Sequence, residues 1–154
     1  MDTREPVGRS LPVVTRSTTL REAVAILSDA RVRWLLVAEA DNIPRAALSG
    51  TDILRALMPS YLLQDPTLAR VYNREAAREV IVTAMKRNLG DVLDEMEARN
   101  WALPTVPPEP TVLEIAAEFV RTGSTVAYIE GSGPKDPRFA TLPGLFQRIS
   151  ERME

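Results

Sequence analysis

Apolar positions in the first third of the chain follow two different periods. After position 19 they recur with the spacing of one helix face, at Leu20, Ala23, Val24, Leu27 and Ala30. Two short runs of strand length follow, WLLVA at 34–38 and RAALS at 45–49, separated by the turn-forming sequence DNIP. A closing helix is expected directly after Ser49, where helical spacing resumes.

The same series of patterns occurs again at a constant offset of 92 positions. LPVVTRSTTLREAVAIL from Leu11 aligns with LPTVPPEPTVLEIAAEF from Leu103, and WLLV at 34–37 aligns with VAYI at 126–129. Ser49 then aligns with Thr141, and IL at 53–54 with LF at 145–146. Because four segments fall in one gapless frame, the sequence indicates an internal duplication.

Each copy begins with an extended LPxV segment and a helix-start signature. Thr19 and Glu22 in the first copy, and Thr111 and Glu114 in the second, have the Thr-x-x-Glu spacing of a capping box. In the second copy a helical pattern, the apolar run TVAYI, the turn sequence GSGPKDP and the short run RFAT follow in order. The order β-α-β-β-α therefore occurs twice, and we predict an α+β fold.

A segment of different character separates the two copies. Asp65 and Pro66 form an N-cap and first-turn pair, and the stretch REAAREVIVTAMKR has helical character. We therefore divide the chain into a first repeat at 10–60, a helical connector at 61–102 and a second repeat at 103–150. The connector is expected to pack on the repeats or against a partner chain.

Composition restricts the chemistry that the chain can perform. Its 154 residues, 45% of them hydrophobic, suffice for one compact core or two small halves packed together. The 19 Lys+Arg and 21 Asp+Glu are mixed along the chain with a formal charge of -2, so we expect no nucleic-acid partner. Cys and His are absent, which excludes disulfides, thiolate metal sites and the usual Ser-His and Cys-His nucleophiles.

The ends and the apolar runs of the chain give an expectation for its location. The first eleven residues, MDTREPVGRSL, lack the apolar stretch of a signal peptide. No apolar run approaches the length needed to cross a bilayer. We therefore expect a cytoplasmic protein with no membrane partner.

The tandem of β-α-β-β-α units, each with its LPxV segment and Thr-x-x-Glu helix start, resembles a pair of CBS (cystathionine-β-synthase-type) domains. This arrangement is called a Bateman module. The resemblance covers about residues 10–58 and 103–150 and leaves the connector outside. It implies that the two repeats pack as a pseudo-twofold CBS-domain pair.

The family motif Gly-h-h-Ser/Thr-x-x-Asp, in which h is apolar, falls at the junction between the last strand and the last helix of each repeat. In the family this junction binds an adenosine ligand, with the Asp accepting from the ribose hydroxyls. The first copy keeps Ser49 and Asp52 but has Ala46 where the family often has Gly. The second copy keeps Thr141 and has Gly144 in place of the Asp. The resemblance thus implies one intact half-site and one degraded half-site.

The resemblance also assigns ligand contacts to Thr51 and Thr141 at the two junctions, to Val14 and Thr15 at the first strand, and to Arg33 before the second strand. Arg31 and Arg33 lie where family members often place basic residues facing phosphates. A purely structural interpretation stands beside it. Ser before a helix is a common N-cap, and Asp in the first turn is favoured by the helix dipole without any ligand. Trp34 and Trp101 offer an adenine stacking surface, or are core residues.

Two functions are therefore weighed. The first is a regulatory module that senses AMP, ADP, ATP or S-adenosylmethionine between its two repeats and acts on an unknown effector protein. The alternative is a ligand-free dimerisation or interaction module with degenerate sites. No nucleophile-base pair, metal-ligand cluster or Gly-rich phosphate loop is visible, so we expect no enzyme and no required cofactor. The resemblance further implies a homodimer. The four ligands share one ribose, so Asp52 does not distinguish them.

Overall fold

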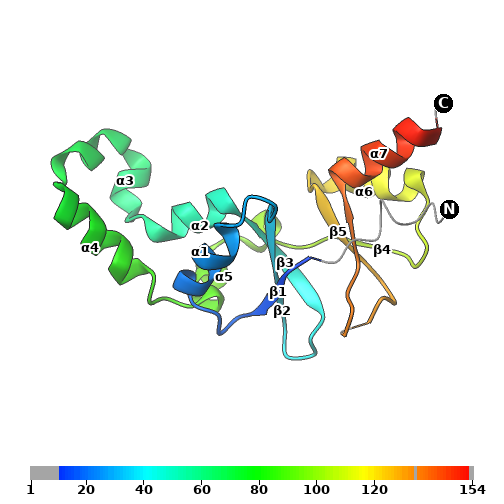
Figure 1. Cartoon of the computed structure of the whole chain (residues 1–154), viewed down its shortest axis with the longest axis horizontal. Coiled ribbons are helices and arrows are strands. Elements are labelled where there is room, and N and C mark those ends of the chain that lie inside the picture. The colour runs from blue at the N-terminus through cyan, green and yellow to red at the C-terminus, as the bar shows by residue number, and fades with distance from the viewer. Residues whose placement is uncertain (1–10, 134, 153–154) are drawn as a thin grey trace. The chain divides into compact units, whose positions relative to one another are not determined.

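The computed structural model describes residues 11–133 and 135–152 (Figure 1). The first repeat contains β1 (Val13–Thr15), α1 (Leu20–Leu27), β2 (Trp34–Ala38), β3 (Pro44–Ser49) and α2 (Gly50–Leu57). The second contains β4 (Thr105–Val106), α6 (Val112–Thr122), β5 (Val126–Ile129), β6 (Phe139–Thr141) and α7 (Leu142–Arg152). The predicted α+β class and the order β-α-β-β-α, repeated once, are confirmed.

The segment between the repeats is mostly helical. It contains α3 (Ser60–Gln64), a 3₁₀ turn at Pro66–Val71, α4 (Arg74–Ala84), α5 (Leu89–Glu95) and a second 3₁₀ turn at Ala98–Asn100. Asp65 caps the first 3₁₀ turn by accepting a hydrogen bond from the Thr67 amide. No helix within residues 11–133 and 135–152 is long and apolar enough to cross a bilayer. The repeat boundaries at 60 and 103 remain a prediction.

The strands form two three-stranded sheets, ordered β1-β2-β3 and β4-β5-β6. In the second sheet β4 runs parallel to β5, with Thr105 opposite Tyr128. β5 and β6 are antiparallel, with Val126 opposite Thr141. The offset found in the sequence reappears in the elements, because α6 starts at Val112, 92 positions after the start of α1 at Leu20.

Both repeats begin their first helix with the predicted capping box. The Thr19 hydroxyl accepts from the Glu22 amide (3.2 Å), and the Glu22 carboxylate accepts from the Thr19 amide (3.2 Å). Thr111 and Glu114 make the same pair of bonds at α6, at 3.1 and 3.0 Å. These contacts occupy amide groups that a helix start otherwise leaves without partners.

The chain divides into two compact units that do not follow the repeats. One takes Met1–Val13, Leu36–Ala47 and Ala102–Glu154, and the other takes Val14–Leu35 and Leu48–Trp101. The first of these units therefore consists mainly of segments from both repeats. The second consists of segments from the first repeat and the connector.

The unit that contains β4, β5 and β6 has its own hydrophobic core. Its buried cluster draws on the sheet and on the inner faces of α6 and α7, and comprises Val106, Ile115, Phe119, Ala127, Ile129, Ala140 and Leu145. Phe139 is also fully buried, and its ring centroid lies 5.9 Å from that of Tyr128. Gly123, with φ of 74°, ends α6 in the left-handed region that glycine adopts without strain.

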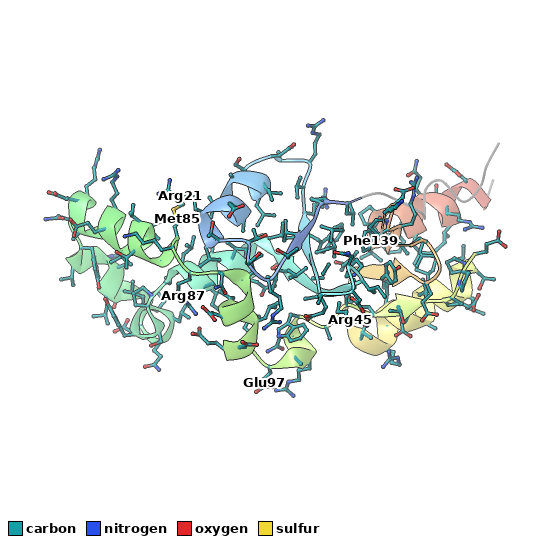
Figure 2. The ribbon with its side chains drawn as sticks, turned by 90° about the horizontal axis from the view of Figure 1, so that it is seen from below. Arg21, Arg45, Met85, Arg87, Glu97 and Phe139 are labelled. Carbon is teal, nitrogen blue, oxygen red and sulfur yellow. The ribbon has the colours of Figure 1, made fainter. Side chains whose placement is uncertain are left out.

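In the unit that contains α1, α2 and α5, the loop between β1 and α1 is hydrogen-bonded to the start of α5. The backbone amides of Leu89 and Gly90 donate to the carbonyls of Thr18 and Arg16, both at 2.8 Å. Gly90 allows this approach, because an added Cβ would lie 3.2 Å from Arg16 Cβ. Figure 2 labels Arg21 and Met85, whose backbones are joined by an N–H to carbonyl hydrogen bond of 3.1 Å.

The apolar core of this unit combines α1 and α2 with residues from the connector. Its buried members are Leu20, Ala23, Leu35, Leu48, Ile53, Leu57, Leu62, Leu89, Val92 and Leu93. The three residues of α5 in this set show that the connector supplies buried apolar residues to this unit. α4, by contrast, has no buried residue.

Candidate functional site

The junction of β3 and α2 brings Ser49 and Asp52 into direct contact. The Asp52 amide donates to Ser49 Oγ (3.2 Å), and the Ser49 amide donates to Asp52 Oδ2 (2.9 Å). Ser49 is extended, with φ of -86° and ψ of 167°, which is the usual backbone of an N-cap. The interpretation of this pair as a helix cap is therefore confirmed, because the two side chains form a capping box at the start of α2.

The second oxygen of Asp52 is not used in this helix start. Asp52 Oδ1 lies 3.6 Å from Arg55 Nη1, which is an ion pair beyond hydrogen-bond distance. A carboxylate has about four lone-pair positions on its two oxygens. Asp52 therefore caps the helix with Oδ2 and can still accept hydrogen bonds at Oδ1.

Asp52 also lines a cavity of about 460 Å³ between α2 and α5, here called the α2–α5 cavity. Its apolar lining comes from α2, α3, α5 and the turns beside them: Ala56, Met58, Pro59, Leu63, Val92 and Met96. Its polar lining residues are Asp52, Arg55, Ser60, Arg87 and Glu95. A mostly apolar wall with a few polar groups, and a volume in the range of about 300–1,000 Å³, are typical of small-molecule sites.

Arg87 and Glu95 form an ion pair at the connector wall of this cavity. Arg87 Nη2 lies 2.6 Å from Glu95 Oε1. The lining thus contains two guanidinium groups and two carboxylates, and the carboxylate of Asp52 is the one that also starts a helix.

Other residues assigned to the site from the sequence lie elsewhere. Thr51 is exposed at the start of α2, and Arg33 is exposed just before β2. Val14 is half-buried on β1, and the exposed Thr15 bonds locally, with its Oγ1 2.8 Å from Ser17 Oγ. Within the described part of the chain, Asp52 is the one residue of the predicted set that lines the α2–α5 cavity.

The equivalent junction in the second repeat has a different character. Thr141 is only 2% exposed, and its hydroxyl accepts a hydrogen bond from the Gly144 amide (3.1 Å) at the start of α7. Gly144 has no side chain to return a bond to the Thr141 amide. This junction therefore holds a helix cap without the carboxylate that the first junction has.

Two further residues considered from the sequence are engaged in local contacts. The Trp101 indole Nε1 donates to the Leu93 carbonyl (3.1 Å), which fixes the ring against α5. Arg31 donates to both carboxylate oxygens of Asp29, at 3.2 and 3.0 Å. These side-chain hydrogen bonds hold the pKa of Asp29 below its ordinary value. Both residues thus have structural partners of their own.

Sequence reasoning missed the part of the site that α5 supplies. Arg55 could have been predicted from the local sequence, because it lies three residues after Asp52 on the same helix face. Arg87 and Glu95 have no such signal, because their approach to α2 depends on tertiary packing. Within residues 11–133 and 135–152, no group of three or more acidic, His or Cys side chains is arranged to hold a metal ion.

Comparison with known proteins finds similarity to CBS-domain proteins in both sequence and structure. The family model of the CBS domain matches residues 3–59. No curated protein matches the chain in sequence. Among solved structures, a CBS domain-containing protein of unknown function from Kribbella flavida is 28% identical, with a TM-score of 0.78, over 97% of this chain and 99% of that one.

More distant structures have the same fold. The CBS domain of a CBS domain-containing membrane protein from Sphaerobacter thermophilus is 18% identical, with a TM-score of 0.66, over 94% of this chain and 85% of that one. CBSX2, a CBS-pair protein from Arabidopsis thaliana, has been solved in complex with AMP. That complex is 14% identical, with a TM-score of 0.61, over 96% of this chain and 94% of that one.

Proposed function

Because the chain is a CBS-domain protein, we propose that it is a non-catalytic regulatory module that binds an adenosine-containing ligand at the start of α2. The observation that carries the proposal is the divided role of Asp52. One oxygen accepts from the Ser49 amide, and the other makes no hydrogen bond with the described residues and lies at the edge of a cavity of ligand size. A carboxylate in this state accepts hydrogen bonds from the two hydroxyls of a ribose.

The comparison with CBSX2 supports the same class of ligand. That protein was solved with AMP, and it has the fold of this chain at low sequence identity. Structural similarity at this sequence identity shows only that the two proteins share a fold, so the ligand proposal for this chain depends on Asp52. Ligand binding would bias the conformation of the module, and an effector protein would respond to that change.

Thermal unfolding in the presence of AMP, ADP, ATP or S-adenosylmethionine tests the proposal. A ligand present at about a hundred times its dissociation constant adds about 2.7 kcal/mol to the free energy of unfolding. For a chain of this size that corresponds to a rise of roughly 5 to 10 °C in Tm. We expect this rise with at least one of the four ligands, and we expect Asp52→Ala to abolish it.

Asp91→Ala is the matched control for this experiment. Asp91 is likewise an acidic residue in a first helical turn, where its amide donates to Asn88 Oδ1 (2.9 Å), and it lies outside the cavity lining; it is exposed, whereas the Asp52 side chain is 19% exposed. The loss of the dipole interaction costs about 0.3 to 1 kcal/mol in Asp91→Ala. Asp52→Ala also removes the hydrogen bond to the Ser49 amide, which adds about 0.5–1.5 kcal/mol, so each variant is compared with and without ligand. If no ligand raises the wild-type Tm at millimolar concentration, the proposed function is wrong.

A second candidate function, dimerisation, is favoured by exposed apolar side chains on α6. Leu113 and Val120 are 79% and 85% exposed, and a spacing of seven residues places them on one face of the helix. Apolar side chains this exposed are typical of residues that a partner covers. We propose that a second copy of the chain covers this face.

The double variant Leu113→Glu, Val120→Glu is expected to convert a dimer into a monomer. Carboxylates on this face would be buried without partners in the dimer, which is strongly unfavourable. Light scattering after size exclusion should give twice the chain mass for the wild type and the chain mass for the variant. Val71→Glu, at a residue that is equally exposed outside α6, should leave the mass unchanged. A monomeric wild type would contradict the dimer.

A further inference from the structure

We infer that a second cavity of the chain, between α2 and α4, binds a small organic cation that has an apolar body. This cavity, here called the α2–α4 cavity, has a volume of about 650 Å³. Neither Ser49 nor Asp52 is one of its lining residues, so it is separate from the proposed adenosine site. The inference therefore goes beyond the proposed function and does not depend on it.

α4 lines this cavity with one face. Ala76, Val80, Thr83 and Ala84 recur at helical spacing, and all four line the cavity. The three apolar residues among them are half-buried, and no residue of α4 is buried. The Asn73 side chain fixes the start of the helix by accepting a hydrogen bond from the Ala76 amide (2.8 Å). The apolar face of α4 is therefore directed at an open space and not at a filled core.

The opposite wall is the end of α2 and the turn that follows it. Residues 56–59 all line the cavity, and all are apolar. Pro59 gives this wall a fixed backbone, with φ of -60°, whereas the unbranched Met58 side chain adapts to the shape of what it contacts. A ligand in this space would cover apolar side chains on two sides, and the burial of that surface favours binding. The volume lies within the range of about 300–1,000 Å³ that is usual for small-molecule sites.

The charge of the lining favours a cation. Glu79 lies on α4 among the lining residues, and it is exposed. Among the residues that the structure describes, it has no ion-pair partner. Arg87, labelled in Figure 2, also lines the cavity, but its Nη2 lies 2.6 Å from Oε1 of Glu95, which is outside this lining. The Arg87 charge is thus compensated from outside the cavity, and Glu79 supplies the uncompensated charge of its lining.

Tyr72 adds an aromatic ring to the same lining. It directly precedes the N-cap of α4 and is half-buried. The face of an aromatic ring attracts a cation, and so does a carboxylate. An ammonium or quaternary ammonium group on an apolar body would therefore find a ring, a carboxylate and apolar walls in one cavity. An anion of the same shape would be repelled by Glu79.

Calorimetric titration of benzyltrimethylammonium, benzyl alcohol and benzenesulfonate into the full chain tests the inference. The three probes share a phenyl ring and differ in charge, and we expect the cation to bind most tightly. Glu79→Gln should weaken cation binding about two- to fivefold, the range expected for a screened, exposed charge, and should leave benzyl alcohol binding unchanged. Glu75→Gln, at an exposed acidic residue one turn earlier and outside the lining, should change neither.

Ala76→Trp tests where the cation binds. The indole would occupy the α2–α4 cavity, so we expect cation binding to weaken by about tenfold or more. Ala76 does not line the α2–α5 cavity, so this loss would not be explained by binding there. Ala77→Trp is the matched control, because Ala77 is the next residue of α4, is exposed and lies outside the lining. It should bind the cation as the wild type does.

Four results would overturn the inference. They are a wild type that does not bind the cation, a wild type that binds benzyl alcohol or benzenesulfonate as tightly, equal cation affinity in the two Trp variants, and equal cation affinity in Glu79→Gln and Glu75→Gln. The last comparison decides the question even if Ala76→Trp does not fold, because both Glu→Gln changes are at exposed positions. The rise in Tm with adenosine ligands tests the proposed function separately.

Discussion

Replacement of Phe139 by alanine is expected to lower the free energy of unfolding by about 3–5 kcal/mol. Phe139 is fully buried on β6. Its ring packs at a tilt against Tyr128, with an interplanar angle of 56°. Phe139 and Tyr128 alternate along their strands with Ala140 and Ala127 of the cluster under α6 and α7, so they lie on the other face of the sheet, where removal of the ring leaves a cavity. Denaturant titration followed by circular dichroism would measure the loss.

Phe146→Ala is the matched control for this prediction. Phe146 is the same residue type in the same compact unit, but it lies on α7 and is 60% exposed. Its truncation removes little buried apolar surface, so the expected change is within about 0.5–1 kcal/mol. Equal destabilisation by the two substitutions would show that burial of Phe139 does not stabilise this unit as described.

A chain truncated after Ser60 is expected to lose cooperative folding altogether. The fragment would keep β1, α1, β2, β3 and α2, which form a complete repeat in the sequence. It would lack α5, whose Leu89, Val92 and Leu93 are buried in the same core as α1 and α2. It would also lack the amides of Leu89 and Gly90 that bond the loop before α1. A core this small and this open does not offset the conformational entropy of the chain.

Far-UV circular dichroism and size exclusion of the fragment and the full chain would check this expectation. The full chain should show a cooperative thermal transition, whereas the fragment should aggregate or show none. A monomeric fragment with a sharp transition would mean that the first repeat is an independent domain. In that case the folding units of the chain would be the sequence repeats and not the two compact units.

The fold could be predicted from the sequence because its signals are local. The capping boxes at Thr19 and Thr111 need residues only three positions apart, and both are present as predicted. The strands at 34 and 126 are short apolar runs between a helix and a turn; the first begins where the pattern placed it, and the second begins one residue after the start of the run TVAYI. The common offset added the information that these signals belong to one repeated unit.

The candidate site could be predicted only in part. The pairing of Ser49 with Asp52 is local, and the structure has it. The α2–α5 cavity is not, because Arg87 lies 35 positions after Asp52 and reaches it through packing of the connector. Nothing in the amphipathic pattern of α5 indicates which helix it contacts. The roles of Val14, Thr15, Thr51, Arg33 and Thr141 in ligand binding remain predictions.

The bond between Trp101 and Leu93 gives the molecule a built-in optical signal. The chain has two tryptophans, and the indole of Trp101 is held by a carbonyl of α5. The same helix contributes Val92 and Glu95 to the cavity wall. Indole emission depends on the polarity and hydrogen bonding around the ring, so displacement of α5 would change its wavelength and intensity. In a Trp34→Phe background Trp101 would be the sole emitter, and its fluorescence would follow the cavity wall in real time without an added label.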